Sequence, residues 1–111
     1  MGTPSKGSVV LIPFPFSDLS KSKLRPSVVL ASSGKGDWIL CQITSKRYTD
    51  PKAVELSNQD FQIGSLRVTS FARPGKLFTA NDSLIVSEVG KLKLNVFDSI
   101  ITSVIDILKE E

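Results

Sequence analysis

The chain has 111 residues, a net charge of +3, one cysteine and no histidine. This length suits a single domain over residues 1–111, large enough to bury one core without disulfides or metals. One cysteine excludes a disulfide within the chain and a cysteine metal cluster, and the lack of histidine removes the usual general base and metal ligand near neutral pH. The N-terminus lacks a signal-peptide layout and no apolar run is long enough to span a bilayer, so we expect a soluble, cytoplasmic protein without membrane contact.

The first predicted elements are a short strand and a polar loop. Val9–Pro13 is apolar and β-branched, and it ends where Pro13 and Pro15 cannot donate backbone hydrogen bonds to a neighbouring strand. Ser17–Lys23 consists of small and polar residues without periodicity, which is typical of a surface loop. This loop leads into Arg25.

A β-hairpin is predicted over Leu24–Ser45, where two apolar, β-branched runs flank a turn at residues 32–37. Alternation gives this hairpin one wholly apolar face, which belongs to a core. The other face carries Arg25 on the first strand and Thr44 on the second.

The register of the hairpin decides which side chains meet on that second face. Placing Ala31 opposite Trp38 also puts Arg25 opposite Thr44, with Cβ atoms about 4.5–5.5 Å apart. A slip by one residue would bury Arg25, whereas a slip by two would put it opposite Gln42 instead.

The rest of the chain is predicted as short strands followed by one helix. A turn at residues 57–60 precedes Phe61 and Ile63, which we expect to anchor in the core. Apolar residues recur at helical spacing over Val96–Leu108, with Asn95 as the N-cap of an amphipathic helix. The remaining strands are predicted at Ala53–Leu56, Leu66–Phe71, Lys76–Thr79 and Leu84–Val89. The fold class is therefore mainly β, a half-open β-barrel with a C-terminal helix.

Charge and residue types favour an anionic partner. The positive residues concentrate before residue 77, and the segment after Lys93 is acidic. Arg25 can donate two parallel hydrogen bonds to a phosphate, and Thr44 and Ser45 can add hydroxyl donors. RNA carries its own nucleophile in the 2′-hydroxyl. The alternative is that Arg25 is a surface or structural arginine and that Thr44 is an ordinary strand residue, with no ligand between them.

Four short motifs, in order along nearly the whole chain, resemble the MazF/PemK family of toxin endoribonucleases. The resemblance implies an SH3-like barrel that forms a homodimer. It further implies cleavage of single-stranded RNA without a metal or other cofactor, leaving a 2′,3′-cyclic phosphate and a 5′-hydroxyl, and inhibition by a cognate antitoxin. The motifs are Lys6-Gly7 with Val9–Phe14, Leu24-Arg25-Pro26, Cys41–Ser45 and Ser70–Thr79.

The resemblance also implies roles for individual residues. Arg25 matches the catalytic arginine of the family, Thr44 matches its threonine partner at the scissile phosphate, and Ser45 is a supporting neighbour. The loop Ser17–Lys23 corresponds to the segment that gates the site. Asp18 is its only acid, so the general base that deprotonates the 2′-hydroxyl is left unassigned.

Further residues are expected to contact RNA. Tyr48 lies in the basic loop after the hairpin and is the preferred candidate for stacking on a base, whereas Phe14, Phe16 and Phe71 are assigned to core packing. The expected RNA-binding residues are Lys21, Lys23, Lys46, Arg47, Tyr48, Arg73 and Lys76, of which the resemblance implies the last two because they match a segment that lines the RNA groove in the family.

Two other functions remain open from the sequence. One is a protein-binding toxin on the same barrel, similar to the CcdB gyrase inhibitors, but those depend on a C-terminal tryptophan that this chain lacks. The other is an RNA-binding relative without catalytic activity, against which the presence of both Arg25 and Thr44 argues.

Overall fold

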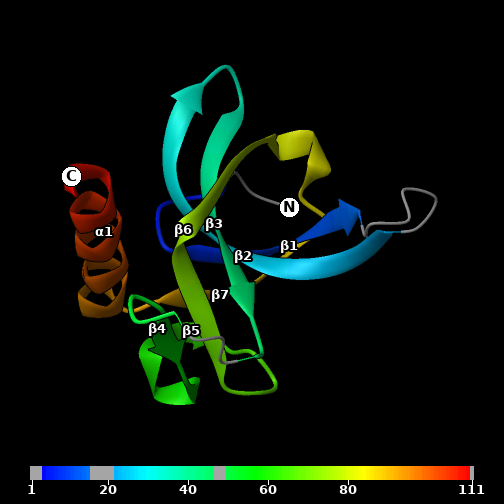
Figure 1. The fold of residues 1–111 in the computed structure, drawn as a ribbon. Helices are drawn as coiled ribbons and strands as arrows, with labels where there is room; N and C mark the ends of the chain where they lie inside the picture. The colour runs from blue at the N-terminus through cyan, green and yellow to red at the C-terminus, as the bar shows by residue number, and fades with distance from the viewer. Residues whose placement is uncertain (1–3, 16–21, 47–49, 111) are drawn as a thin grey trace.

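A computed structural model describes residues 4–15, 22–46 and 50–110, which form one antiparallel sheet and a C-terminal helix (Figure 1). Neighbouring strands follow the order β4-β6-β3-β2-β1-β7-β5. The sheet curls into a nearly closed barrel, so the predicted fold class is confirmed. The elements are β1 Ser8–Pro15, β2 Ser22–Gly34, β3 Asp37–Thr44, β4 Val54–Leu56, the 3₁₀ turn η1 Asn58–Asp60, β5 Phe61–Gly64, β6 Ser70–Asn81, the 3₁₀ turn η2 Asp82–Leu84, β7 Ser87–Leu92 and α1 Leu94–Lys109.

The predicted hairpin is confirmed as β2 and β3. Val28 pairs with Cys41, which is the expected register in the middle of the hairpin. The expected pair of Ala31 with Trp38 is wrong, because Ala31 pairs with Ile39. The register shifts between Val29 and Ala31, and such a bulge inserts one extra residue into one strand of a pair.

Both faces of the hairpin are covered by apolar side chains. Val28 and Cys41 belong to a core cluster that also contains the buried helix residues Val96, Ile100 and Val104. Leu40, on the opposite face, belongs to a second apolar cluster. The other buried members of this cluster are Val10, Ile12, Val29, Ala80 and Ile85. The face that carries Arg25 and Thr44 is therefore polar only toward one end of the hairpin.

The segment predicted as two strands after residue 65 is arranged differently. Residues 65–69 are irregular, and β6 begins at Ser70 and continues through Arg73-Pro74-Gly75. Cys41 pairs with Leu77 but Ile43 pairs with Ala72, so residues 73–76 form a bulge. A bulge tolerates Pro74, which cannot donate to the ladder.

The strands and helix near the C-terminus depart from the prediction in detail. Phe61 is buried as expected, but Ile63 is 65% exposed because it lies on the edge strand β5. The strand β7 covers Ser87–Leu92, so it begins and ends three residues later than the predicted Leu84–Val89. The N-cap of α1 is Lys93, two residues before the predicted Asn95, and Leu108 is 74% exposed.

A close approach between β5 and β7 gives a stability prediction. A Cβ at Gly90 would lie 2.7 Å from the backbone oxygen of Ile63 and 2.8 Å from Cδ2 of Phe61. Gly90→Ala should therefore lower the free energy of unfolding by about 1–3 kcal/mol in urea titrations. At Gly75 the nearest atom to a new Cβ is Cδ1 of Ile107 at 3.8 Å, so Gly75→Ala should change stability by about 0.5 kcal/mol at most. Equal effects of the two substitutions would contradict this packing.

The helix α1 packs against β6 along one side of the barrel (Figure 1). Its 16 residues present Val96, Ile100 and Val104 to the core. In the described part of the chain, no helix has the length and apolarity needed to cross a bilayer.

Candidate active site

The register of the hairpin places Arg25 and Thr44 on the same side of the sheet. Ser27 pairs with Gln42 across β2 and β3, and Arg25 and Thr44 each lie two residues beyond that pair. Because side chains alternate along a strand, both point to the side of Ser27 and Gln42. Continuing this register puts Arg25 opposite Thr44, and the slip by two residues is excluded.

A cavity of about 210 Å³ lies where β2 begins and β3 ends, and both residues line it. Three of its lining side chains are basic, Lys23, Arg25 and Arg67, and none of the described lining side chains is acidic. A concentration of basic side chains at one cavity favours an anionic ligand. The other lining residues are Leu24, Pro26, Ile43, Thr44, Ser45, Leu66, Val68 and Ser70.

Thr44 is held by the backbone of the loop that follows it. Its side chain is 7% exposed, and its Oγ1 accepts a hydrogen bond of 3.2 Å from the backbone N–H of Lys46. Within the described residues no acceptor binds the Thr44 hydroxyl hydrogen, so that hydrogen is available to a ligand in the cavity. Ser45 is exposed beside it.

Arg25 is half-buried on β2, where it pairs with Ile12 of β1. A guanidinium stays protonated in proteins, so at this position it supplies a fixed positive charge and donors in a planar fork. Lys23 and Arg67 are exposed at the same cavity. The cavity can therefore hold a phosphate between a fixed cation and hydroxyl groups.

Arg73 and Lys76, the other expected RNA-binding residues that the structure describes on β6, do not line this cavity. Arg73 Nε lies 3.4 Å from Oδ2 of Asp50, and both side chains are largely covered. Lys76 is exposed in the bulge of β6, and Lys46 is exposed after Thr44. The predicted contact residues Lys21, Arg47 and Tyr48, together with Asp18 and Phe16, lie outside the described residues.

Two aromatic residues near the site have different surroundings. Phe71 pairs with Thr44 across β3 and β6 and is half-buried. Phe14 packs edge-on against Phe78 with ring centroids 4.9 Å apart, next to the second apolar cluster. Its packing therefore agrees with the core role expected from the sequence.

Cys41 is a structural residue of the core. Its thiol donates to the backbone carbonyl of Arg73 at 3.1 Å. Burial raises the pKa of the Cys41 thiol to about 12, against a smaller lowering effect of that hydrogen bond. Because the thiolate is the reactive form, this residue supplies no nucleophile at neutral pH.

The sequence interpretation missed Arg67 and its neighbours. It placed Leu66 to Phe71 in a strand, whereas residues 65–69 form a loop whose Leu66, Arg67 and Val68 close the cavity. The dipeptide Gly64-Ser65 is a turn signal that could have indicated this loop. No group of metal-ligating side chains that could hold an ion occurs among the described residues.

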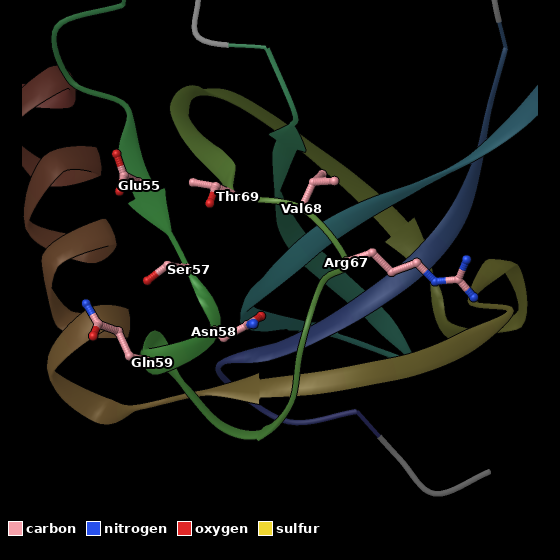
Figure 2. A pocket seen from close by; sticks show the side chains of 7 residues that line it. All are labelled: Glu55, Ser57, Asn58, Gln59, Arg67, Val68 and Thr69. Atoms are coloured by element: carbon pink, nitrogen blue, oxygen red, sulfur yellow. The ribbon is translucent and has the colours of Figure 1, made fainter.

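A second, larger hollow lies beside the first. Its volume is about 580 Å³, and Figure 2 shows its side chains arranged along β4 and η1 on one side and the loop 67–69 on the other. Arg67 and Val68 line both cavities. The lining residues are Glu55, Ser57, Asn58, Gln59, Arg67, Val68 and Thr69.

Comparisons with known proteins agree with this architecture. A family model described as PemK-like, MazF-like toxin of type II toxin-antitoxin system matches residues 5–108. No sequence among curated proteins matches significantly. The identity to each solved structure below is under 25%, so these likenesses show the fold, whereas the family model covers most of the chain.

Three similar solved structures illustrate the likeness. MazE-MazF (Form-II) from Deinococcus radiodurans has a TM-score of 0.79 and 17% identity over 100% of both chains. An endoribonuclease from a mycobacterial species has a TM-score of 0.72 and 18% identity over 97% of this chain and 93% of that one. A mycobacterial endoribonuclease in complex with its cognate antitoxin has a TM-score of 0.74 and 17% identity over 97% of both chains.

Proposed function

Because the chain belongs to the PemK-like, MazF-like toxins of type II toxin-antitoxin systems, we propose that it is an endoribonuclease that cuts single-stranded RNA at specific short sequences. The observation that carries this proposal is the cavity lined by Arg25 and Thr44. Its basic side chains and hydroxyl groups suit the phosphate of an RNA backbone.

The reaction needs only the RNA and this chain. The 2′-hydroxyl oxygen attacks the adjacent phosphorus, the bond from phosphorus to the 5′-oxygen breaks, and the products are a 2′,3′-cyclic phosphate and a 5′-hydroxyl. Negative charge grows on the non-bridging oxygens in the transition state. Arg25 stabilises that charge with paired donors, and the Thr44 hydroxyl adds one hydrogen bond. The group that takes the 2′-hydroxyl proton is not assigned to any described residue.

Two partners belong to the same proposal. A mycobacterial structural relative is described in complex with its cognate antitoxin, and we expect a cognate antitoxin to inhibit this chain. We also expect a homodimer, since apolar side chains such as Leu108 of α1 and Leu84 remain exposed in the single chain. Light scattering that detects only a 12.1 kDa species at micromolar concentration would contradict the dimer.

One experiment tests the activity. The purified protein is incubated with a long single-stranded RNA in EDTA, and both ends of each fragment are mapped and identified. Discrete cuts with 2′,3′-cyclic phosphate and 5′-hydroxyl ends are expected. The Arg25→Ala protein, purified in parallel, controls for a contaminating nuclease. Intact RNA with a folded wild-type protein would instead support the RNA-binding relative without catalysis.

Binding of RNA should depend on salt. The cavity offers the three cations Lys23, Arg25 and Arg67 to phosphates, and each phosphate contact with single-stranded nucleic acid contributes a slope of about −0.7 in log K against log salt. An RNA with 2′-O-methyl groups, which cannot be cleaved, should therefore bind with a slope of about −2. Fluorescence anisotropy over a salt series measures this slope, and a flat titration would contradict phosphate binding.

A further inference from the structure

The hollow lined by Glu55, Ser57, Asn58, Gln59, Arg67, Val68 and Thr69, here called the β4–η1 hollow, adjoins the candidate active site. The two cavities share Arg67 and Val68 as a common wall. The β4–η1 hollow is therefore the cavity next to the site where Arg25 and Thr44 would hold a phosphate. The volume of about 580 Å³ lies within the range of about 300–1,000 Å³ that is usual for small-ligand sites.

Unpaired polar side chains occupy the β4–η1 hollow. In the described part of the chain, no hydrogen bond or ion pair engages the side chains of Glu55, Asn58 or Gln59, and Asn58 and Gln59 are exposed. Figure 2 shows Arg67 extending away from these side chains, so the carboxylate and the amides line the β4–η1 hollow without the guanidinium between them. Their donors and acceptors are free to bind a ligand.

The backbone that carries Asn58 is held in place from two sides. The carboxylate of Asp60 accepts hydrogen bonds from the backbone N–H of Ser57 at 2.8 Å and from its hydroxyl at 3.1 Å. The backbone oxygen of Asp60 accepts from the N–H of Lys93 at 2.9 Å, at the start of α1. A rigid turn lowers the entropy cost of binding by the side chain that it presents.

The chemistry of these groups suits a base and not a phosphate. The carboxylate of Glu55 repels a phosphate, but it accepts hydrogen bonds from the exocyclic amino group of a base. Amide side chains bind adenine in pairs of hydrogen bonds, and carboxylates accept from the amino group of cytosine. Unpaired bases in single-stranded RNA expose such edges.

On the basis of the function proposed above, we propose that the β4–η1 hollow binds one base next to the scissile phosphate and selects a base with an exocyclic amino group. Asn58 and Glu55 read the edge of this base, with Gln59 beside them. Arg67, in the shared wall, contacts the phosphate between this base and the cut. Sequence preference thus arises in the hollow, and cleavage arises at Arg25 and Thr44.

The test is cleavage of an RNA pool randomised on both sides of the cut, with each product sequenced. Wild-type protein should discriminate against uracil at one position beside the cut. Asn58→Ala and Glu55→Gln should each reduce that discrimination about 5- to 150-fold, since one lost base contact has this range of effects. The loss of rate should fall on the sequences that carry an amino-bearing base there, and thermal unfolding confirms that both variants fold.

Two further variants distinguish an effect on base selection from a general effect on RNA binding. Gln62→Ala, an exposed amide on β5 outside the hollow, should leave the profile unchanged. Arg67→Ala should weaken binding of all sequences alike and make the salt slope shallower by about 0.7.

The outcomes that overturn this inference are distinct from those that overturn the proposed function. If wild-type protein cuts RNA and both Asn58→Ala and Glu55→Gln keep its full profile, the β4–η1 hollow does not read a base. The same conclusion holds if these variants change only the binding of an antitoxin. If wild-type protein does not cut RNA, the proposed function fails, and this inference fails with it.

Discussion

Replacing Arg25 with alanine should lower the rate of RNA cleavage on the order of 10³–10⁵-fold, the range that an arginine contributes at a phosphoryl transition state. The fold should survive, because Arg25 is half-buried and belongs to neither buried core cluster. Single-turnover kinetics on a short RNA with one cut site measures the rate, and circular dichroism checks the fold. Arg25→Lys should recover only part of the activity, since an ammonium keeps the charge but lacks the paired donors.

A matched control separates loss of charge from loss of the site. Lys35 is exposed in the turn at the far end of the same hairpin, so Lys35→Gln removes one positive charge without touching the cavity. We expect its cleavage rate to stay within about twofold of wild type, because an exposed charge at that distance is largely screened. Cutting by Arg25→Ala at the wild-type rate would remove this residue from the reaction.

The parts of the fold that the sequence predicts are those with a clear period. Val28 and Cys41 lie on the two strands of the hairpin, and apolar and polar residues alternate along both. A slip of the pairing register by one residue would bury Arg25, so the alternation fixes which side chains share a face. The helix is equally clear, since Val96, Ile100 and Val104 recur on one side and are buried. Alternation cannot reveal a bulge, however, and the pairing of Ala31 with Ile39 follows from one.

The parts that could not be predicted depend on contacts between distant segments. Arg73-Pro74-Gly75 is a strong local signal for a break, but β3 and β4 both pair with β6 and keep it continuous around the bulge. Ile63 looks like a core residue from its type, yet it lies on an edge strand and faces outward. Local propensity gives way to tertiary pairing in both cases.

The same distinction applies to the candidate site. The proximity of Arg25 and Thr44 could be predicted from the sequence because both residues belong to one hairpin. Arg67 lies more than 20 residues after Thr44 in the sequence and reaches the cavity only because the loop 65–69 folds over it. Arg73 is expected at the RNA groove from the family resemblance, and in the folded chain its Nε lies 3.4 Å from Oδ2 of Asp50, a contact that the sequence does not indicate.

The hydroxyl of Thr44 provides the sharpest test of the proposed chemistry, because valine has nearly the same shape without it. Thr44→Val should lower the cleavage rate on the order of 10²–10³-fold, the usual effect of losing one donor aimed at developing charge, with little change in KM. Thr44→Ser, which keeps the hydroxyl, should stay close to wild type.

Stability should not account for the loss caused by Thr44→Val. Thr44 is 7% exposed, so the methyl group that replaces the hydroxyl is buried. The backbone N–H of Lys46, which loses its acceptor, can donate a hydrogen bond to water instead. Thr79→Val, an exposed strand position on β6 outside the cavity, should cleave like wild type. Equal activities of Thr44→Val and Thr79→Val would mean that the hydroxyl does not act on the phosphate, and the transition state would then depend on Arg25 without a hydroxyl donor from β3.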